Sequence, residues 1–70
     1  MKQHSFTLTT QYIELIKLLK FIGIASDGAD AKNLVEQNMV FSNGVPELRK
    51  RYKVRVGDVI TCGDHTITIS

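Results

Sequence analysis

Five of the chain's nine lysine and arginine residues fall within seven consecutive positions, Arg49 to Arg55, which read RKRYKVR. Arginine can hold phosphate oxygens with paired hydrogen bonds and lysine adds a compact charge, so this combination suits an anionic backbone. Tyr52 stands among the cations, and its ring can either stack on an exposed base or pack against the protein. We call residues 49–55 the basic segment and treat it as the first candidate binding site.

The charge of the remaining chain is nearly balanced. The formal net charge is +2, and the seven acidic residues are spread from Glu14 to Asp64. The positive charge is therefore local to the basic segment. If its cations bind a nucleic acid by releasing counterions, the affinity should fall as the salt concentration rises.

Catalytic and metal sites are not expected. His4 and His65 are far apart in the sequence, and Cys62 is the only cysteine, so no zinc-ligand spacing and no intramolecular disulfide are available. We find no nucleophile with a neighbouring base and no pair of carboxylates in contrasting surroundings. We therefore expect a protein that is not an enzyme and that uses no cofactor and no metal.

The compartment is inferred from cysteine usage and hydrophobicity. A lone cysteine fits a reducing environment, and the first ten residues contain no continuous apolar run. The most hydrophobic stretch, Tyr12 to Ala25, is interrupted by Glu14, Lys17 and Lys20. We expect a cytoplasmic protein without a membrane span.

The elements that must position the basic segment begin with a strand and two helices. Phe6 and Leu8 alternate with polar residues, which predicts a short strand. Apolar residues recur at helical spacing from Gln11 to Ile22, and Gly23 is suited to end that helix. A second helix is predicted to begin after Ser26 or Asp27 as cap and to stop in the left-handed region at Asn38.

Strands dominate the second half of the chain. Met39 to Phe41 reads as a strand that enters the turn Asn43-Gly44, the strongest short hairpin signal present. Pro46 limits the return strand to a short one or to a sheet edge, which leaves the basic segment on a loop. A final hairpin joins Val59–Cys62 to His65–Ile69. The sequence thus predicts a single α+β domain, residues 1–70, in the order strand, helix, helix and several strands.

Three stretches between Ile22 and Ile60 carry a resemblance to a known family: IGIASDGADAK, LVEQNMVFSNG and RKRYKVRVGDVI. They resemble the RNA-binding domain first known from the fourth protein of the small ribosomal subunit, the alpha-L motif, and are most similar to its stand-alone bacterial YbcJ-like or YaaA-like members. The resemblance covers nearly the whole chain, including the helix around Tyr12 and the closing DHTITI. It implies an α+β fold in which two antiparallel helices pack on a small bent antiparallel sheet, in the order β-α-α-β-β-β-β.

The resemblance also implies which residues face RNA. The family's RNA surface comprises the start of the second helix and a loop between strands. On matching positions this surface consists of Ser26, Gly28, Lys32, Asn43, Gly44, Arg49, Lys50, Arg51, Tyr52, Lys53 and Arg55. Asp27 stands where many members carry arginine, which removes one expected phosphate contact, whereas Asn38 replaces a common glycine and tolerates the same left-handed geometry.

We therefore expect a non-catalytic RNA-binding protein that contacts the backbone of structured, ribosomal-type RNA, with the ribosome or its subunits as candidate partners. We expect it to act as a monomer. Two alternatives stay open: the basic segment docks on an acidic protein partner while the edge strand near Pro46 accepts a partner strand, or the target is double-stranded DNA. The role of Lys32 is equally open, because it can bind phosphate or pair with Glu36.

Overall fold

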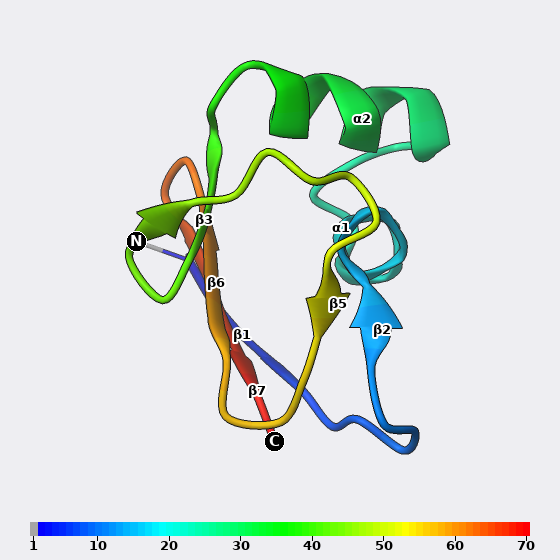
Figure 1. Ribbon diagram of the computed structural model, residues 1–70, viewed down its shortest axis with the longest axis vertical. Coiled ribbons are helices and arrows are strands. Elements are labelled where there is room, and N and C mark those ends of the chain that lie inside the picture. Colours follow the sequence, from blue (N-terminus) through cyan, green and yellow to red (C-terminus); the bar gives the residue numbers. More distant parts are fainter. Residues whose placement is uncertain (1) are drawn as a thin grey trace.

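The computed structural model describes residues 2–70 and divides them into two layers (Figure 1). A five-stranded sheet forms one layer, in the spatial order β1-β7-β6-β3-β4. Both helices, together with a separate two-stranded sheet of β2 and β5, form the other layer. The elements are β1 Lys2–Phe6, β2 Ile13–Glu14, α1 Leu15–Ile22, α2 Gly28–Glu36, β3 Val40–Ser42, β4 Val45–Pro46, β5 Lys53–Val54, β6 Val59–Cys62 and β7 His65–Ile69.

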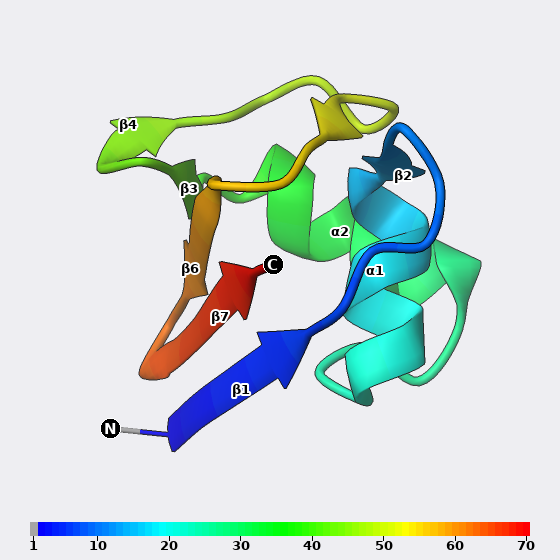
Figure 2. The same cartoon turned by 90° about the horizontal axis from the view of Figure 1, so that it is seen from below.

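The predicted α+β class is confirmed, but two details of the arrangement differ. The larger sheet is mixed. Strand β1 pairs in parallel with β7, whereas all other neighbouring strands of this sheet pair antiparallel. The helices cross rather than lie antiparallel: in Figure 1 α1 is seen nearly end-on while α2 runs across the view, and in Figure 2 α1 is seen from the side. The parallel pairing joins the two ends of the described chain, and the helix crossing is set by packing in the core, so local patterns specify neither.

The first helix is four residues shorter than predicted, and two of the missing residues form a strand instead. It begins at Leu15 rather than Gln11. Ile13 and Glu14 instead pair with Val54 and Lys53 to form the two-stranded sheet. A long-range pairing therefore overrides the helical pattern at this end of α1.

The turn residues behave as their chemistry predicts. Gly23 ends α1 at a φ of 93°, and Asn38 follows α2 at a φ of 59°. Asn43 and Gly44 have φ values of 52° and 83°, the two positive angles of a tight hairpin turn. The return strand β4 has two residues and lies at the sheet edge, as Pro46 required.

The core lies between the layers. Each helix contributes the apolar residues of one face, and the larger sheet contributes the alternate residues that point toward the helices. Its fully or almost fully buried members are Leu15, Leu18, Leu19, Ala25, Ala31, Val35, Val40, Val54, Ile60, Cys62, Ile67 and Ile69. Cys62 is thus a buried core residue, and burial raises the pKa of its thiol.

Candidate nucleic-acid interface

The backbone of the basic segment is attached to the first turn of α1. The N–H of Leu15 donates to the carbonyl of Tyr52 at 2.9 Å, and the N–H of Ile16 donates to the carbonyl of Lys50 at 3.3 Å. These amides have no partner within the helix, because the first four N–H groups of any α-helix lack one. The segment therefore caps α1 while the helix holds the segment in place.

Asp58 fixes the other end of the basic segment. Its Oδ2 accepts a hydrogen bond from the N–H of Arg55 at 2.9 Å and from the hydroxyl of Tyr52 at 3.4 Å. Its Oδ1 accepts from Nδ2 of Asn43 at 3.2 Å. One carboxylate thus joins the basic segment to the β3–β4 turn.

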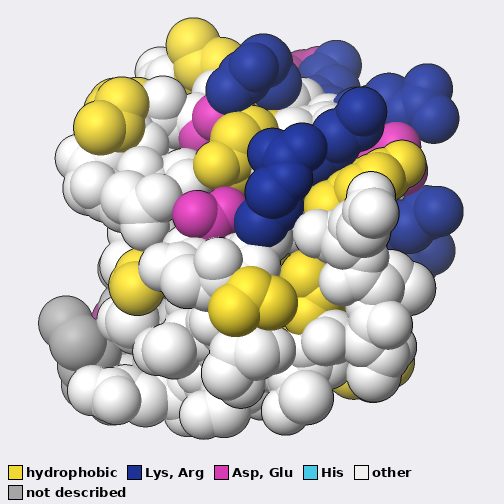
Figure 3. Space-filling model, turned by 60° about the horizontal axis from the view of Figure 1, so that its bottom comes forward, with side chains coloured by type: hydrophobic (Ala, Val, Ile, Leu, Met, Phe, Trp, Pro, Cys, Tyr) yellow, Lys and Arg dark blue, Asp and Glu magenta, His cyan; other side chains and the backbone are white. Residues whose placement is uncertain are grey.

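Four of the five cations line one hollow of about 480 Å³ together with Tyr52. They are Arg49, Arg51, Lys53 and Arg55, which a turn, closed by the N–H of Tyr52 on the carbonyl of Arg49 at 3.2 Å, and the following strand β5 bring to one hollow. In Figure 3, lysine and arginine side chains gather on one face, with hydrophobic and acidic groups between them. The fifth cation, Lys50, forms an ion pair with Glu36 at the end of α2.

Carboxylates hold two of the arginines in position. Glu47 binds Arg49 through two side-chain hydrogen bonds of 3.0 and 3.1 Å and also accepts from the Arg49 N–H at 3.0 Å. Glu14 accepts from Nε of Arg51 at 3.0 Å and lies 3.7 Å from Nζ of Lys17. These side-chain hydrogen bonds hold the pKa values of both glutamates below their ordinary value.

The arginines remain accessible despite these pairs. The side chains of Arg49 and Arg51 are 74% and 81% exposed. Lys53 lies over the ring of Tyr12, with Nζ 5.1 Å from the centroid. Within residues 2–70 the side chain of Arg55 forms no ion pair. The hollow is thus lined by cations whose charged groups can still reach a ligand.

Tyr52 follows the packing alternative. Its side chain is half-buried in the structure, and its hydroxyl contacts Ser42 Oγ and Asp58 at 3.3 and 3.4 Å. The guanidinium of Arg49 lies 5.1 Å from the ring centroid, above one face of the ring. Tyr52 therefore packs against the protein and lies beneath the guanidinium of Arg49.

The start of α2 uses its polar groups within the protein. Asp27 is the N-cap, and its Oδ1 accepts from the N–H of Asp30 at 2.8 Å. Asp30 in turn accepts from the N–H of Ser26 at 3.0 Å. Gly28, the first residue of α2, is followed by this acidic first turn, so the helix dipole is already matched by negative charge.

The predicted site residues do not all lie together. Glu36, which contacts Lys50, is at the opposite end of α2 from Gly28. Nine helical residues span about 13 Å, so Ser26 and Gly28 lie well apart from the basic segment. Lys32 is exposed between the two ends, and its charge helps to lower the pKa of Glu36, although Lys50 makes the ion pair.

Asn43 and Gly44 are placed by turn chemistry. The Asn43 side chain accepts from the N–H of Val59 at 2.9 Å through Oδ1 and donates to Asp58 through Nδ2. Gly44 is exposed at the tip of the turn, in the left-handed conformation. These contacts connect the turn to the start of β6 and to the end of the basic segment.

Sequence reasoning missed the acidic residues that organise the site. The pairing of Glu47 with Arg49 could be suspected from a separation of two residues, but Glu14 and Arg51 are 37 positions apart. Nothing local marks Asp58 as the partner of both the basic segment and the β3–β4 turn. Their roles appear only once the chain is folded.

Two comparisons with known proteins agree with this architecture. Residues 6–70 match the family model described as the S4 domain. The chain is 33% identical over 58 residues to a protein of Escherichia coli (strain K12) that bears the name "Putative RNA-binding protein YbcJ", with 83% of each chain covered. A Shigella flexneri protein named "Uncharacterized protein YbcJ" shows the same identity and coverage.

The helices of the described chain are also informative about membranes. Neither helix within residues 2–70 is long and apolar enough to cross a bilayer.

The family model spans both helices, the larger part of both sheets and the whole basic segment. The chain therefore belongs to the S4 domain family.

Proposed function

We propose that this chain binds structured RNA and that the hollow of the basic segment binds the phosphate backbone. The observation that carries the proposal is the convergence of Arg49, Arg51, Lys53 and Arg55 on one exposed hollow. Guanidinium groups match phosphate oxygens in geometry, and such contacts dominate the affinity of proteins for nucleic acids. The name of the Escherichia coli relative supports RNA as the ligand.

The acidic partners are compatible with this role. The guanidinium groups of Arg49 and Arg51 keep donors that Glu47 and Glu14 do not use, so a phosphate can bind either arginine without first breaking its ion pair. Glu47 and Glu14 each leave most of their partner's side chain open to solvent. They also restrict the arginines before binding, which reduces the entropy lost when a phosphate is bound.

The finer proposal is that the RNA is ribosomal and that its fold matters more than its sequence. The cations of the hollow can contact phosphates but carry no base-specific arrangement, and phosphate contacts by themselves do not read sequence. Lys32, exposed on α2, is a further candidate for a phosphate contact. We place the protein in the cytoplasm, with the ribosome or its subunits as partners.

The test is a salt series with two charge-matched double variants. Lys53→Ala/Arg55→Ala removes two hollow cations that form no ion pair within residues 2–70, so the fold should be retained. Lys2→Ala/Lys20→Ala removes the same charge from β1 and from the end of α1. Binding of total ribosomal RNA is measured by filter retention, and folding by circular dichroism.

The first variant should lose affinity by roughly tenfold or more. Its plot of log affinity against log salt concentration should have a slope smaller in magnitude by about 1.5, while the control stays near wild type. Equal losses in both variants would mean that only net charge matters. Unaltered binding in the first variant would place the site elsewhere. Competition by duplex DNA of equal length decides between RNA and DNA.

One feature favours a protein partner as the second candidate. The edge strand β4 carries Val45 at 64% exposure, and Leu48, just after it, is 58% exposed. An acidic partner could contact the basic segment while its own strand pairs with this edge. Partners that remain bound after nuclease treatment would support this candidate, whereas partners lost on RNA digestion were bridged by RNA.

A further inference from the structure

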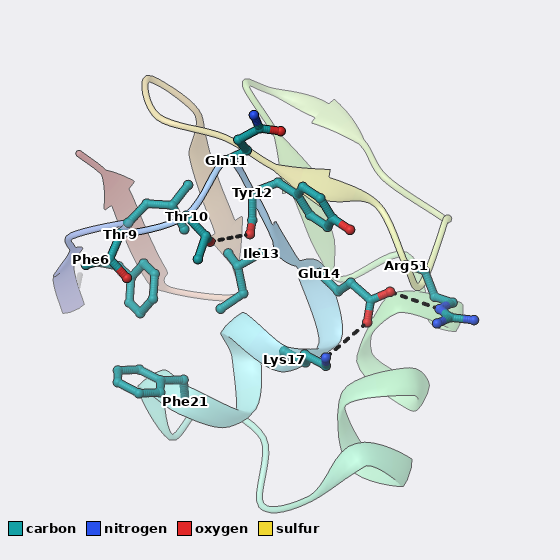
Figure 4. A pocket seen from close by; sticks show the side chains of 11 residues that line it. Phe6, Thr9, Thr10, Gln11, Tyr12, Ile13, Glu14, Lys17, Phe21 and Arg51 are labelled. Carbon is teal, nitrogen blue, oxygen red and sulfur yellow. Dashed lines mark hydrogen bonds and ion pairs between the residues drawn. The ribbon is translucent and has the colours of Figure 1, made fainter.

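A second hollow adjoins the basic segment, and no residue in it except Arg51 belongs to the predicted site. It measures about 690 Å³ and lies between the Leu8–Tyr12 loop and the outer face of α1 (Figure 4). Phe6 and Ile13 contribute to its apolar lining, and Lys17 and Phe21 project from α1. Arg51 lines this hollow as well as the first one.

Phe21 is the unusual residue in this hollow. Its side chain is 73% exposed although it sits on a helix with an otherwise buried apolar face. The ring of Phe6 meets it edge-to-face, with centroids 5.1 Å apart and an interplanar angle of 82°. Phe6 thereby fixes the ring while most of it stays open to solvent. An exposed, supported aromatic ring is what a nucleobase needs for stacking.

The polar lining fits the rest of a nucleotide. Lys17 and Arg51 both lie against Glu14 beside the hollow, so two cations share one carboxylate (Figure 4). One positive charge is left over at this point, where a phosphate can replace the carboxylate as partner. The hydroxyl of Thr10 donates to the carbonyl of Tyr12, whereas Thr9 and Gln11 make no side-chain hydrogen bond within residues 2–70. Their polar atoms are available to the edge of a base.

We infer that this hollow binds one unpaired nucleotide of the RNA, with its base stacked on Phe21 and its phosphate held between Arg51 and Lys17. The inference rests on the proposed RNA-binding function and adds to it a preference for RNA with an unstacked base beside a structured region. Because Arg51 lines both hollows, a backbone that follows the basic segment reaches the second hollow without a break. The exposed face of the Phe21 ring, with Thr9 and Gln11 in the same hollow, favours a nucleotide over an acidic peptide, since the positive rim alone would attract either.

The test uses two RNA probes and three variants of Phe21. The probes are a hairpin that carries a single unpaired adenosine bulge and the same hairpin without the bulge. Phe21→Ala removes the ring, Phe21→Leu keeps apolar bulk without a π-face, and Phe21→Trp keeps stacking. The chain has no tryptophan, so Phe21→Trp also supplies a single fluorescent reporter.

Wild type should prefer the bulged hairpin, and Phe21→Ala and Phe21→Leu should both lose roughly tenfold of affinity for it while binding the perfect hairpin normally. Tryptophan fluorescence of Phe21→Trp should be quenched by the bulged probe only. Equal affinity of wild type for both hairpins, or full affinity of Phe21→Leu for the bulged one, would overturn the inference.

The outcomes separate this inference from the proposed function. If the perfect hairpin binds in a salt-dependent way and Phe21 has no effect, the stacking site is wrong while RNA binding stands. If neither hairpin binds wild type, both the proposed RNA-binding function and the stacking site are contradicted. Quenching of Phe21→Trp by a polyglutamate peptide containing leucine, and not by RNA, would assign the hollow to a protein partner.

Discussion

The carboxylate of Glu14 determines how freely Arg51 can meet a phosphate. It is bound to Arg51 at 3.0 Å and lies near Lys17, and both contacts help to lower its pKa. A phosphate that approaches Arg51 must therefore compete with a fixed negative charge. The same carboxylate repels any phosphate at the second hollow.

Glu14→Gln should raise the affinity for RNA by roughly threefold, because it removes this repulsion while it keeps the size of the side chain. The gain should shrink at high salt, where charges are screened. Affinity is measured by fluorescence anisotropy with a labelled hairpin at two salt concentrations. A loss of affinity would show instead that Glu14 is needed to orient Arg51.

At the scale of elements, the basic segment owes its shape to contacts with three neighbours. The first turn of α1 holds its backbone, the two-stranded sheet fixes Lys53 and Val54, and Asp58 binds its last residue. Asp58 also bonds to Asn43, so the β3–β4 turn and the basic segment share one anchor. Loss of that anchor should loosen the segment without opening the core.

Asp58→Ala should lower the free energy of unfolding by about 1–2 kcal/mol, because the N–H of Arg55 and the amide of Asn43 lose a charged acceptor. Amide hydrogen exchange should quicken most in residues 52–55 and in the β3–β4 turn. Asp64→Ala, at an exposed aspartate in the final turn, is the matched control. Exchange that quickens evenly over the whole chain would contradict a local role.

The elements also mark how far the sequence could be interpreted alone. Gly23, Asn38 and the Asn43-Gly44 turn were predicted correctly, because a left-handed backbone depends on the residue at that position. The final hairpin was also predicted with its boundaries. By contrast, the start of α1 was placed four residues too early, and the parallel pairing of β1 with β7 was not anticipated. Both are set by partners more than thirty positions away.

In the candidate site, too, the features set by local sequence could be predicted and those set by distant contacts could not. Clustering of cations in the sequence was enough to identify the basic segment, whose alternate side chains then share one hollow. The second hollow could not be foreseen, because it joins the Leu8–Tyr12 loop, α1 and Arg51 from distant parts of the chain. Tyr12 falls within the predicted helix from Gln11 to Ile22, whereas it precedes α1, is 40% exposed and lies under Lys53.

For the whole molecule, the ion pairs around the basic segment make stability depend on pH. Three glutamates, Glu14, Glu36 and Glu47, have pKa values lowered from 4.5, chiefly by side-chain hydrogen bonds to Arg51, Lys50 and Arg49. Near that pH the unfolded chain therefore binds more protons than the folded one. Their stabilising contribution is complete above about pH 4.5 and is lost as the pH falls through the lowered values.

Glu47 should account for the largest share of this acid sensitivity, because its side chain is 11% exposed, against 19% for Glu14 and 53% for Glu36. Glu47→Gln should cost about 1–2 kcal/mol at neutral pH, since three hydrogen bonds from Arg49 lose a charged acceptor. In acid, below the lowered pKa of Glu47, the variant and the wild type should converge, because protonation then neutralises Glu47 in the wild type as well. Urea unfolding at both pH values measures the two differences, with Glu36→Gln as the exposed control. A deficit of the Glu47 variant that persists unchanged in acid would mean that the shape of the contact, and not its charge, stabilises the protein.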